Sequence, residues 1–560
     1  MPERKANKIM PFAQGAEFYF AKYKRKLEQG QYIEALCALR VACEKEPENR
    51  EYALELAELY TEMDFYEESN YILLKLFPKD PDYQEECLYG MGCNFFGLQD
   101  IDRAKECFEK VLRYYPGGNY EEDAADFLEY LEEEQQIGGI LSAAVFAEAE
   151  KGRRCLDNGE TGQAIEIFSK LAEAYPEQVF LKNNLALSLY CAGETDKAIA
   201  LSRQVLMQER YNPHAICNLL LFANGAGKKE LVETYRPLLD KADCREADDD
   251  IKVALTYCEL GEEEKAYPLF RRALEELPYD GQVLYFAAAC AQNLGKYAEA
   301  QQYFAEILKL WPQNTVVSYY KQKMQRCRDT GSVLKIPYTC QVPEEEIARR
   351  LLYLNTQFAL PDEALRELWQ QDAEFSALVL WGMEAGGPAA RKMIIGVLVR
   401  IGDARAEEIM RRQLLKREES DEAKNMLFFA LHYIGAKQPY IAYVSGKMTE
   451  VRLGATEPSL GKVPDSYDEI LRQLLELLTR LQQKKMLPQA VGLFSEYLST
   501  YTKPPALRNC KAWAGALAVL ALQEEGVQVR PEQAAELLDI QVRSINRCMG
   551  LIRRKMAEKS

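Results

Sequence analysis

The sequence contains very little histidine, and this scarcity argues against several classes of enzyme. Among 560 residues there are only two, His214 and His432, more than two hundred positions apart. A catalytic triad, a histidine zinc site or a general-base dyad would depend on one of them alone. The sequence also lacks GxxxxGK[ST] and any GxGxxG after a strand-like run, so it does not support nucleotide binding. We therefore expect no enzymatic activity, no cofactor and no metal.

The fifteen cysteines do not form a recognisable disulfide or zinc pattern, because no CxxC pair occurs among them. Most lie within helical apolar patterns, as Cys107 and Cys258 do, which is typical of small buried hydrophobic residues. No run approaches the roughly 18 apolar residues that a membrane span requires. The first fifteen residues lack the apolar core of a signal peptide. These absences predict a cytoplasmic protein without a membrane partner.

The composition is that of a folding chain, with 48% hydrophobic and 28% charged residues. The formal net charge of -17 argues against coating a polyanion or an acidic membrane with the whole surface. Any contact with nucleic acid would therefore have to involve a local part of the chain.

The sequence does contain one pattern that recurs every 34 residues. A complete copy has a small residue, an aromatic residue four positions later and a proline eight positions after that. The two clearest copies are Ala266, Phe270 and Pro278, then Ala300, Phe304 and Pro312, with matching turns at Gly261 and Gly295. The same frame occurs earlier around Ala35, Ala104, Ala164 and Ala198, and less regularly around Ser69 and Val232. These positions define eight copies.

This spacing resembles the tetratricopeptide repeat, a helix–turn–helix hairpin that stacks into a superhelix. The small residues let paired helices touch, the aromatic residue fills the gap and the proline ends the second helix. No single hairpin buries its apolar face alone, so stability comes from stacking. We predict an all-α solenoid with three hairpins in residues 16–116, after a leader of residues 1–15, and five in residues 144–330. Residues 117–143 interrupt the period and are predicted to form an inserted helix or joint.

The array is expected to end in a closing helix and a turn-rich connector before helices resume at Glu344. Within residues 344–450, two segments share an apolar helix, an Ile-Gly turn and a second helix. Their turns are Ile401-Gly402 and Ile434-Gly435, and the segments are similar to HEAT repeats. A boundary rich in glycine and proline follows at Val451–Asp465.

The last part of the chain, residues 466–560, is predicted to form five helices around an alanine-rich central one. It resembles the cyclin-box repeat of transcription factor IIB, and its final pair resembles a helix-turn-helix. Ala535, Leu538, Ile540 and Ile545 occupy the small and apolar positions that pack such a pair. Asp539 stands where the turn usually has glycine, but aspartate tolerates a left-handed backbone.

The tetratricopeptide resemblance implies that the first helix of each hairpin lines a concave groove for an extended peptide or a partner helix. The implied groove residues are Phe180, Asn183, Asn184, Tyr190, His214, Asn218, Asn224, Tyr285 and Gln292. Asn184 and Asn218 share one place in successive repeats, where peptide-gripping members carry asparagine. An amide both donates and accepts, so it can hold a peptide backbone. The alternative is that these asparagines bond within the hairpins.

A carboxylate clamp of the chaperone-binding kind is not expected. Such clamps need several lysines and arginines around the shared asparagine. The neighbouring repeats offer Ala149, Arg153, His214 and Asn218, so these basic residues are largely missing.

A second interpretation rests on the C-terminal helices. From Pro505 onward there are nine lysines and arginines against six acids, which gives this part a net charge of +3. In a DNA-binding arrangement the last helix would direct Arg543, Ser544 and Asn546 to base edges, and Arg547, Arg553, Arg554 and Lys555 to phosphates. The alternative is that the cyclin-like part binds only protein.

The sequence thus favours a non-enzymatic adaptor that holds a peptide or protein segment in its concave groove. The competing hypothesis is a transcription-type regulator whose array senses a partner while its C-terminal helices bind DNA. These two functions differ in salt dependence, because phosphate contacts weaken steeply as salt rises.

Overall fold

The computed structural model describes residues 14–77, 83–136, 143–157, 159–330, 332, 334–384, 386–417, 419–444, 447–453, 465–481, 483, 486–499, 505, 507–524 and 529–557. Most of the predicted leader and most of the predicted boundary after Val451 lie outside these residues. The chain folds as two compact units, Met1–Glu450 and Val451–Ser560.

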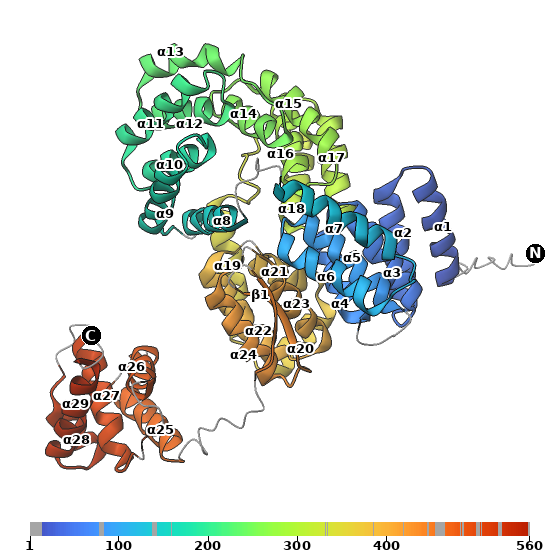
Figure 1. Ribbon diagram of the computed structural model, residues 1–560. Helices are drawn as coiled ribbons and strands as arrows, with labels where there is room; N and C mark the ends of the chain where they lie inside the picture. The colour runs from blue at the N-terminus through green and yellow to red at the C-terminus, as the bar shows by residue number, and fades with distance from the viewer. Residues whose placement is uncertain are drawn as a thin grey trace, which may run out of the picture. The chain divides into compact units, whose positions relative to one another are not determined.

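The first three hairpins open the N-terminal unit (Figure 1). They are α1 (Ala16–Glu28) with α2 (Tyr32–Lys45), α3 (Arg50–Glu62) with α4 (Tyr66–Leu76), and α5 (Gln84–Gly97) with α6 (Ile101–Tyr114). The segment predicted as an inserted helix or joint contains α7 (Glu121–Gln136), which packs on α6. There the ring of Phe127 stacks on Phe108 with centroids 4.9 Å apart. The helical stack therefore continues through α7.

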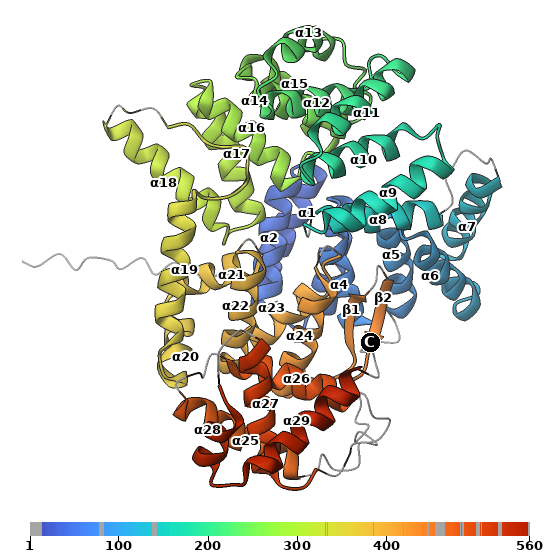
Figure 2. The ribbon, with the colours of Figure 1, turned by 90° about the vertical axis from the view of Figure 1, so that its left-hand side faces the viewer.

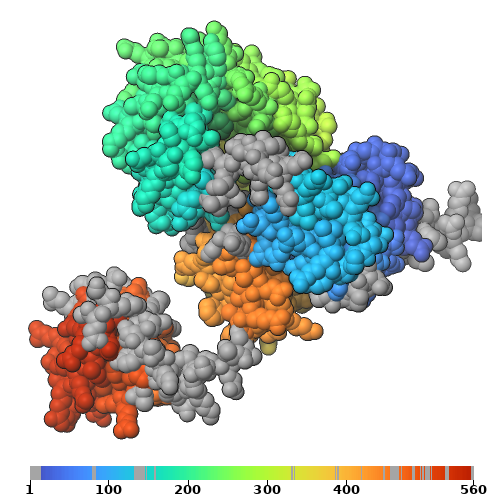
Figure 3. All heavy atoms as spheres, viewed as in Figure 1, coloured from blue at the N-terminus to red at the C-terminus, as the bar shows by residue number. Residues whose placement is uncertain are grey.

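Five further hairpins follow and trace an arc in Figure 1. Figure 3 shows the same helices as a band of packed atoms, coloured from teal through green to yellow-green. The helices are α8 (Ala143–Asp157), α9 (Thr161–Ala174), α10 (Val179–Cys191), α11 (Thr195–Gln208), α12 (Pro213–Gly225), α13 (Lys229–Leu239), α14 (Ala247–Glu259), α15 (Glu263–Glu276), α16 (Gly281–Asn293) and α17 (Tyr297–Leu310). The array ends in α18 (Thr315–Thr330). The predicted all-α solenoid is confirmed.

The packing explains the repeated residues. Ala266, Phe270, Ala300 and Phe304 are completely buried, as expected for residues that hold paired helices together. At Gly92 a Cβ atom would lie 2.6 Å from the ring of Phe108, so only glycine permits this close approach. The turns at Gly261 and Gly295 have φ angles of 76° and 77°, a left-handed conformation that favours glycine.

After the array the chain forms six helices and a two-stranded sheet. The helices are α19 (Glu344–Phe358), α20 (Asp362–Gln371), α21 (Ala373–Glu384), α22 (Gly387–Ile401), α23 (Ala404–Leu414) and α24 (Asp421–Tyr433). The strands β1 (Tyr440–Val444) and β2 (Lys447–Val451) lie side by side in Figure 2.

This sheet corrects one prediction, because the second HEAT-like copy has no second helix after Ile434-Gly435. In the first copy, α22, the Ile401-Gly402 turn and α23 follow the predicted order. In the second, the residues YIAYV are aromatic or β-branched at four of five positions and favour a strand. Tyr443 and Met448 also pack into the core of the second and third hairpins. Tertiary packing therefore reinforces the strand conformation.

The eighth hairpin returns to the first two within the N-terminal unit. The Arg40 guanidinium donates to the carbonyl of Leu310 at 2.7 Å. Lys309 Nζ lies 2.8 Å from Glu34 Oε1, and the ring of Trp311 contacts Phe65 at 5.6 Å between centroids. Helix α17 thus packs on α2, and the two ends of the array touch.

The C-terminal unit has the five predicted helices. They are α25 (Asp465–Arg480), α26 (Leu487–Ser499), α27 (Cys510–Glu524), α28 (Pro531–Leu538) and α29 (Val542–Ala557). Helix α27 contacts the other four, and its alanines Ala514, Ala516, Ala518 and Ala521 are buried. At Gly515 a Cβ atom would lie 2.7 Å from Ile545 Cδ1, so α29 crosses α27 at this glycine.

Candidate functional site

The candidate groove is built on α10, α12, α14 and α16, the first helices of the last four hairpins. Two of them, α12 and α16, begin at a side chain that caps the helix. Asp280 Oδ1 accepts from the amides of Gln282 and Val283 at 2.8 Å and caps α16. Asn212 Oδ1 accepts from the amide of Ala215 at 2.9 Å and caps α12, whose first residue is a proline. Capping fixes where each helix starts and hence which side chains it directs to a given face.

Asn183 and Asn218 bond between hairpins. Asn218 is 2% exposed, and its Nδ2 donates to the carbonyl of Asn183 at 3.1 Å. Asn183 Nδ2 donates to Asn212 Oδ1, also at 3.1 Å. These two residues therefore connect α10 to α12 and to the turn before it. Asn184, one residue further along α10, is half-buried, and Asn224 at the end of α12 is exposed. They are the more accessible of the predicted asparagines.

The remaining predicted residues on α10 and α12 are held by ring contacts and charges. Phe180 stacks on Phe146, and Tyr190 stacks on Phe222 with centroids 4.4 Å apart. His214 Nε2 lies 3.4 Å from Asp249 Oδ1 on α14. Burial lowers the pKa of His214, and the positive charge of Lys252 adds to this while Asp249 opposes it. His214 therefore tends toward the neutral form.

Tyr285 and Gln292 face a feature that the sequence did not predict. The connector from Leu334 to Gln341 lies against α16, with residues 334–337 outside any regular secondary structure and residues 338–341 in a turn and a bend. Tyr285 Oη donates to the carbonyl of Pro337 at 3.1 Å, and Gln292 Nε2 donates to that of Leu334 at 3.2 Å. Both tyrosine and glutamine are almost completely buried. Part of the candidate groove is thus occupied by the chain itself.

Asn293 makes the most specific contact with this connector. Its Nδ2 donates to the carbonyl of Ile336 at 3.0 Å, and its Oδ1 accepts from the amide of Ile336 at 2.8 Å. One side-chain amide therefore pairs with one residue in both directions, as a neighbouring strand would. The backbone-gripping role that we expected of Asn184 and Asn218 is performed here by Asn293.

The connector ends at two further anchors. Tyr320 Oη on α18 donates to the carbonyl of Gln341 at 2.9 Å, and Trp381 Nε1 on α21 donates to Gln341 Oε1 at 3.2 Å. Val342, the next residue, is 3% exposed. The connector is therefore fixed at its C-terminal end to helices outside the candidate groove.

Tyr338 in the connector covers two cysteines of the groove helices. Burial, together with hydrogen bonding to Cys258, raises the pKa of Tyr338. Cys258 on α14 and Cys290 on α16 are themselves buried, and Cys290 Sγ donates to the carbonyl of Glu263 at 3.4 Å. The ring of Tyr338 also stacks near Phe270.

A row of carboxylates lies on the first helices of the N-terminal hairpins and was not singled out from the sequence. Tyr23 Oη donates to Glu55 Oε2 at 2.7 Å, and Tyr120 Oη donates to Glu86 Oε1 at 3.1 Å. Burial and the negative charges of Glu86 and Glu55 raise the pKa of Glu58 to about 7. Spacing within one helix could not reveal these cross-hairpin neighbours.

The predicted DNA-binding residues all lie on α29. Arg543, Asn546, Arg547, Arg553 and Arg554 are exposed, whereas Ser544 and Lys555 are half-buried. The turn before α29 has Asp539 in the left-handed conformation, with φ 53°. Ile545, Cys548 and Ile552 occupy the opposite face and pack into the core of this unit.

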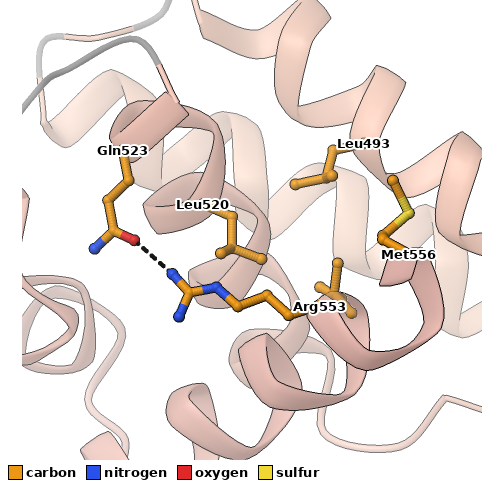
Figure 4. Close-up of a pocket in the computed structure, with 6 residues that line it drawn as sticks. Leu493, Leu520, Gln523, Arg553 and Met556 are labelled. Carbon is orange, nitrogen blue, oxygen red and sulfur yellow. Dashed lines mark hydrogen bonds between the residues drawn. The ribbon is translucent and has the colours of Figure 1, made fainter. Parts of the chain in front are cut away.

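A cavity of about 340 Å³ opens beside this helix (Figure 4). It is lined by apolar side chains of α26, α27 and α29, among them Leu493, Leu520 and Met556. Arg553 crosses it and donates from Nη2 to Gln523 Oε1 at 3.0 Å. This contact holds the guanidinium of Arg553 against α27.

Two further observations concern the described residues only. No described helix is both long and apolar enough to cross a membrane. Within the same residues, no group of three histidine, cysteine, aspartate or glutamate side chains is arranged to hold a metal ion.

Comparisons with known proteins identify the repeats. Residues 86–118 and 282–314 match the family model described as tetratricopeptide repeat. The second match contains the groove residues Tyr285 and Gln292 of α16. The TPR repeat-containing protein YvcD of Bacillus subtilis (strain 168) is 27% identical over 224 residues, which are 38% of this chain and 45% of that protein. The match therefore spans less than half of the relative's length.

Solved structures are also similar. A tetratricopeptide repeat protein from Parabacteroides merdae has 13% sequence identity and a TM-score of 0.24, and the likeness covers 49% of this chain and 97% of that one. The TPR2AB domain of yeast Sti1, solved as a complex with pHSP90, has 14% identity and a TM-score of 0.20, covering 46% and 98%. The family model and the Bacillus relative, together with the eight hairpins, identify the helical array of this chain as one of tetratricopeptide repeats.

Proposed function

We propose that this protein is a non-enzymatic, cytoplasmic adaptor whose concave helices hold an extended segment of a partner protein. The observation that carries the proposal is the two-way pairing of Asn293 with the backbone of Ile336. In this pairing, the first helix of a hairpin holds an extended backbone through a side-chain amide. Asn184 and Asn224 offer the same chemistry from α10 and α12.

Backbone pairing of this kind supports recognition of extended segments with limited side-chain selectivity. Selectivity would come from the aromatic side chains that line the same helices, such as Phe180 and Tyr190. The aromatic stack of Tyr190 on Phe222 fixes one of these surfaces in place. An ordered surface of this kind lowers the entropy lost on binding.

The proposal is tested by affinity capture of partners from lysate of the source organism with the full-length protein. We expect a defined set of proteins that survives nuclease and that Asn184→Ala with Asn224→Ala reduces at least fivefold. Gln204→Ala is the matched control, because Gln204 is an exposed amide on α11, the second helix of its hairpin. Equal capture by the double variant and the wild type would contradict the assigned groove.

The second candidate function is DNA binding by the C-terminal unit. Two observations favour it: Asp539 adopts the left-handed turn that a helix-turn-helix requires, and α29 directs several arginines to solvent. In this hypothesis the array would sense a partner protein while α29 enters the major groove. In this hypothesis, basic side chains of α29 that contribute to the net charge of +3 would contact the DNA phosphates.

Electrophoretic mobility shift of duplex DNA with the full-length protein at 50 and 200 mM salt tests this candidate. Phosphate contacts would lower the affinity at least tenfold between these conditions. Arg543→Gln with Arg547→Gln should abolish the shift, whereas Arg508→Gln changes an exposed arginine outside the final helix pair and should preserve it. No shift at 50 mM salt would eliminate this candidate.

A further inference from the structure

We propose that residues 334–341 are a displaceable internal occupant of the groove on α16, and that this site takes a partner segment of the same chemistry. The partner is an extended protein segment with an aliphatic residue followed two positions later by a tyrosine. The inference rests on the proposed adaptor function and adds to it a ligand class and a means of regulation.

The connector presents two distinct faces, as an extended peptide on a surface does. Ile336 is 1% exposed and Tyr338 is half-buried, whereas Lys335, Pro337 and Thr339 between and beyond them are exposed. This alternation has the period of two that places successive side chains on opposite sides of a strand. The buried residues of the connector are therefore the ones that a partner must reproduce.

Most of the hydrogen bonds to residues 334–339 are made to the backbone, and one, from Asn293 Nδ2 to Tyr338 Oη at 3.2 Å, is made to a side chain. Tyr285, Gln292 and Asn293 donate to the carbonyls of Pro337, Leu334 and Ile336, and Asn293 also accepts from the amide of Ile336. Any extended segment can supply these groups. The side chains of Ile336 and Tyr338 supply the selectivity. Ile336 is buried, and the ring of Tyr338 contacts that of Phe270.

The geometry also allows the occupant to leave without unfolding the array. The connector is anchored separately at Gln341 by Tyr320 and Trp381. Just before this anchor, Cys340 has a left-handed backbone with φ 51°, which is unfavourable for a residue with a side chain. Residues 334–339 can therefore detach while Gln341 stays in place and Cys340 relaxes.

A tethered occupant competes strongly with a partner in solution. For a short flexible connection the effective concentration is on the order of a millimolar, so a partner must bind well or be locally concentrated to displace it. The connector thus sets a minimum affinity for binding to the groove, which weak, non-specific peptides do not reach. It would raise the selectivity of the groove for its partner.

The test uses a fluorescent peptide with the sequence VLKIPYT, residues 333–339, and measures its anisotropy with full-length protein. The release variant is Ile336→Ser with Tyr338→Ser, and Lys335→Ser is the control at an exposed position of the connector. We expect the release variant to bind the peptide at least tenfold more tightly than the wild type or the control. Adding Asn293→Ala to the release variant should lower this affinity at least tenfold.

Two native thiols report whether the connector has left. In the release variant, Cys258 and Cys290 should be alkylated at least fivefold faster than in the wild type, and the peptide should restore their protection. Cys217, which is completely buried on α12, serves as the internal control for folding. Alkylation of Cys258 and Cys290 at the wild-type rate would contradict the inference, since the connector would not be what shields them.

The outcomes also separate this inference from the proposed function. A folded release variant that fails to bind the peptide, but captures partners through Asn184 and Asn224, overturns only the displaceable occupant. A wild-type protein that binds the peptide as tightly as the release variant overturns it too, because the site would then not be occluded. Failure of both peptide binding and partner capture contradicts the adaptor as well.

Discussion

The side chain of Asn293 and the backbone of Ile336 form a closed pair of hydrogen bonds across 43 residues of sequence. The pair joins the last turn of α16 to the connector and defines the direction in which an extended chain crosses the helix. It also explains why an amide is needed there. A carboxylate accepts but cannot donate, and a hydroxyl cannot span both groups.

Asn293→Asp should loosen the connector without disturbing the hairpin. It removes the donor to the Ile336 carbonyl while it keeps an acceptor for the Ile336 amide. A net loss of about 1 kcal/mol is expected, which corresponds to roughly fivefold faster hydrogen exchange at Ile336. Gln302→Glu, at an exposed amide of α17, should leave this exchange rate unchanged. Unaltered exchange in Asn293→Asp would refute the pairing.

Ala300→Leu should damage the fold before it affects any binding. Ala300 is completely buried between paired helices, so a larger side chain overpacks the contact by about 1–3 kcal/mol. Ala298→Leu, two positions earlier on the same helix and exposed, should change stability by less than about 0.5 kcal/mol. Urea unfolding followed by circular dichroism measures both. Equal stabilities of the two variants would disprove the register of the repeat.

Gly515→Val should destabilise the C-terminal unit by about 1–3 kcal/mol, because its Cβ would overlap the side chain of Ile545. We expect hydrogen exchange to accelerate in α27 and α29 and to stay unchanged in α14 and α16. Gly550→Ala is the control on α29, where a Cβ meets no neighbouring atom. It should instead stabilise the helix by up to about 1 kcal/mol.

Glu58→Gln should raise stability at high pH only. The pKa of Glu58 is about 7 in the folded protein and 4.5 as its ordinary value, so the folded state binds this proton more tightly. Wild-type stability therefore falls as the pH rises from 4.5 to 7, and the variant avoids this loss. Neighbouring helices crowd the Glu58 carboxyl group, but the residue still keeps contact with solvent, so solvent screening keeps the gain below about 1 kcal/mol at pH 8.

Melting temperatures at pH 4 and pH 8 check this prediction. The two proteins should melt at nearly the same temperature at pH 4, where Glu58 is mostly protonated in both the folded and unfolded states. Glu51→Gln, at an exposed position on the same helix, should show a smaller difference between the two pH values. A gain for Glu58→Gln that is as large at pH 4 as at pH 8 would argue against the raised pKa.

Much of the fold could be predicted because the residues that pack paired helices together recur at regular positions in the repeat. Ala266 and Ala300 stand where paired helices touch, and such contacts occur at a fixed distance along the sequence. The prediction failed at Tyr440, where a helix was expected and a strand forms. A short run of apolar and aromatic residues suits either element, and here its pairing with Lys447–Val451 and its packing on distant hairpins favour the strand.

The candidate site was less predictable, because its contacts join distant segments. Tyr285 and Gln292 were placed on the correct helix from the repeat frame, but Asn293 was missed, since its role depends on the path of the connector. Asn218 and Asn184 occupy equivalent places in their repeats, yet Asn218 is buried against α10 and Asn184 is more accessible. Whether Asn184 grips a partner stays a prediction.

The contact between the eighth hairpin and the first two has a consequence for how the N-terminal unit unfolds. A linear repeat array has two terminal repeats that each lack one neighbour, and it can fray from either end. Here the first and eighth hairpins contact one another, through the hydrogen bond from Arg40 to Leu310 and the ion pair of Glu34 with Lys309. Each of these hairpins therefore gains the neighbour that a terminal repeat lacks. Removing one terminal hairpin would therefore expose the opposite terminus as well. The N-terminal unit should unfold in a more concerted manner than an open array of the same length.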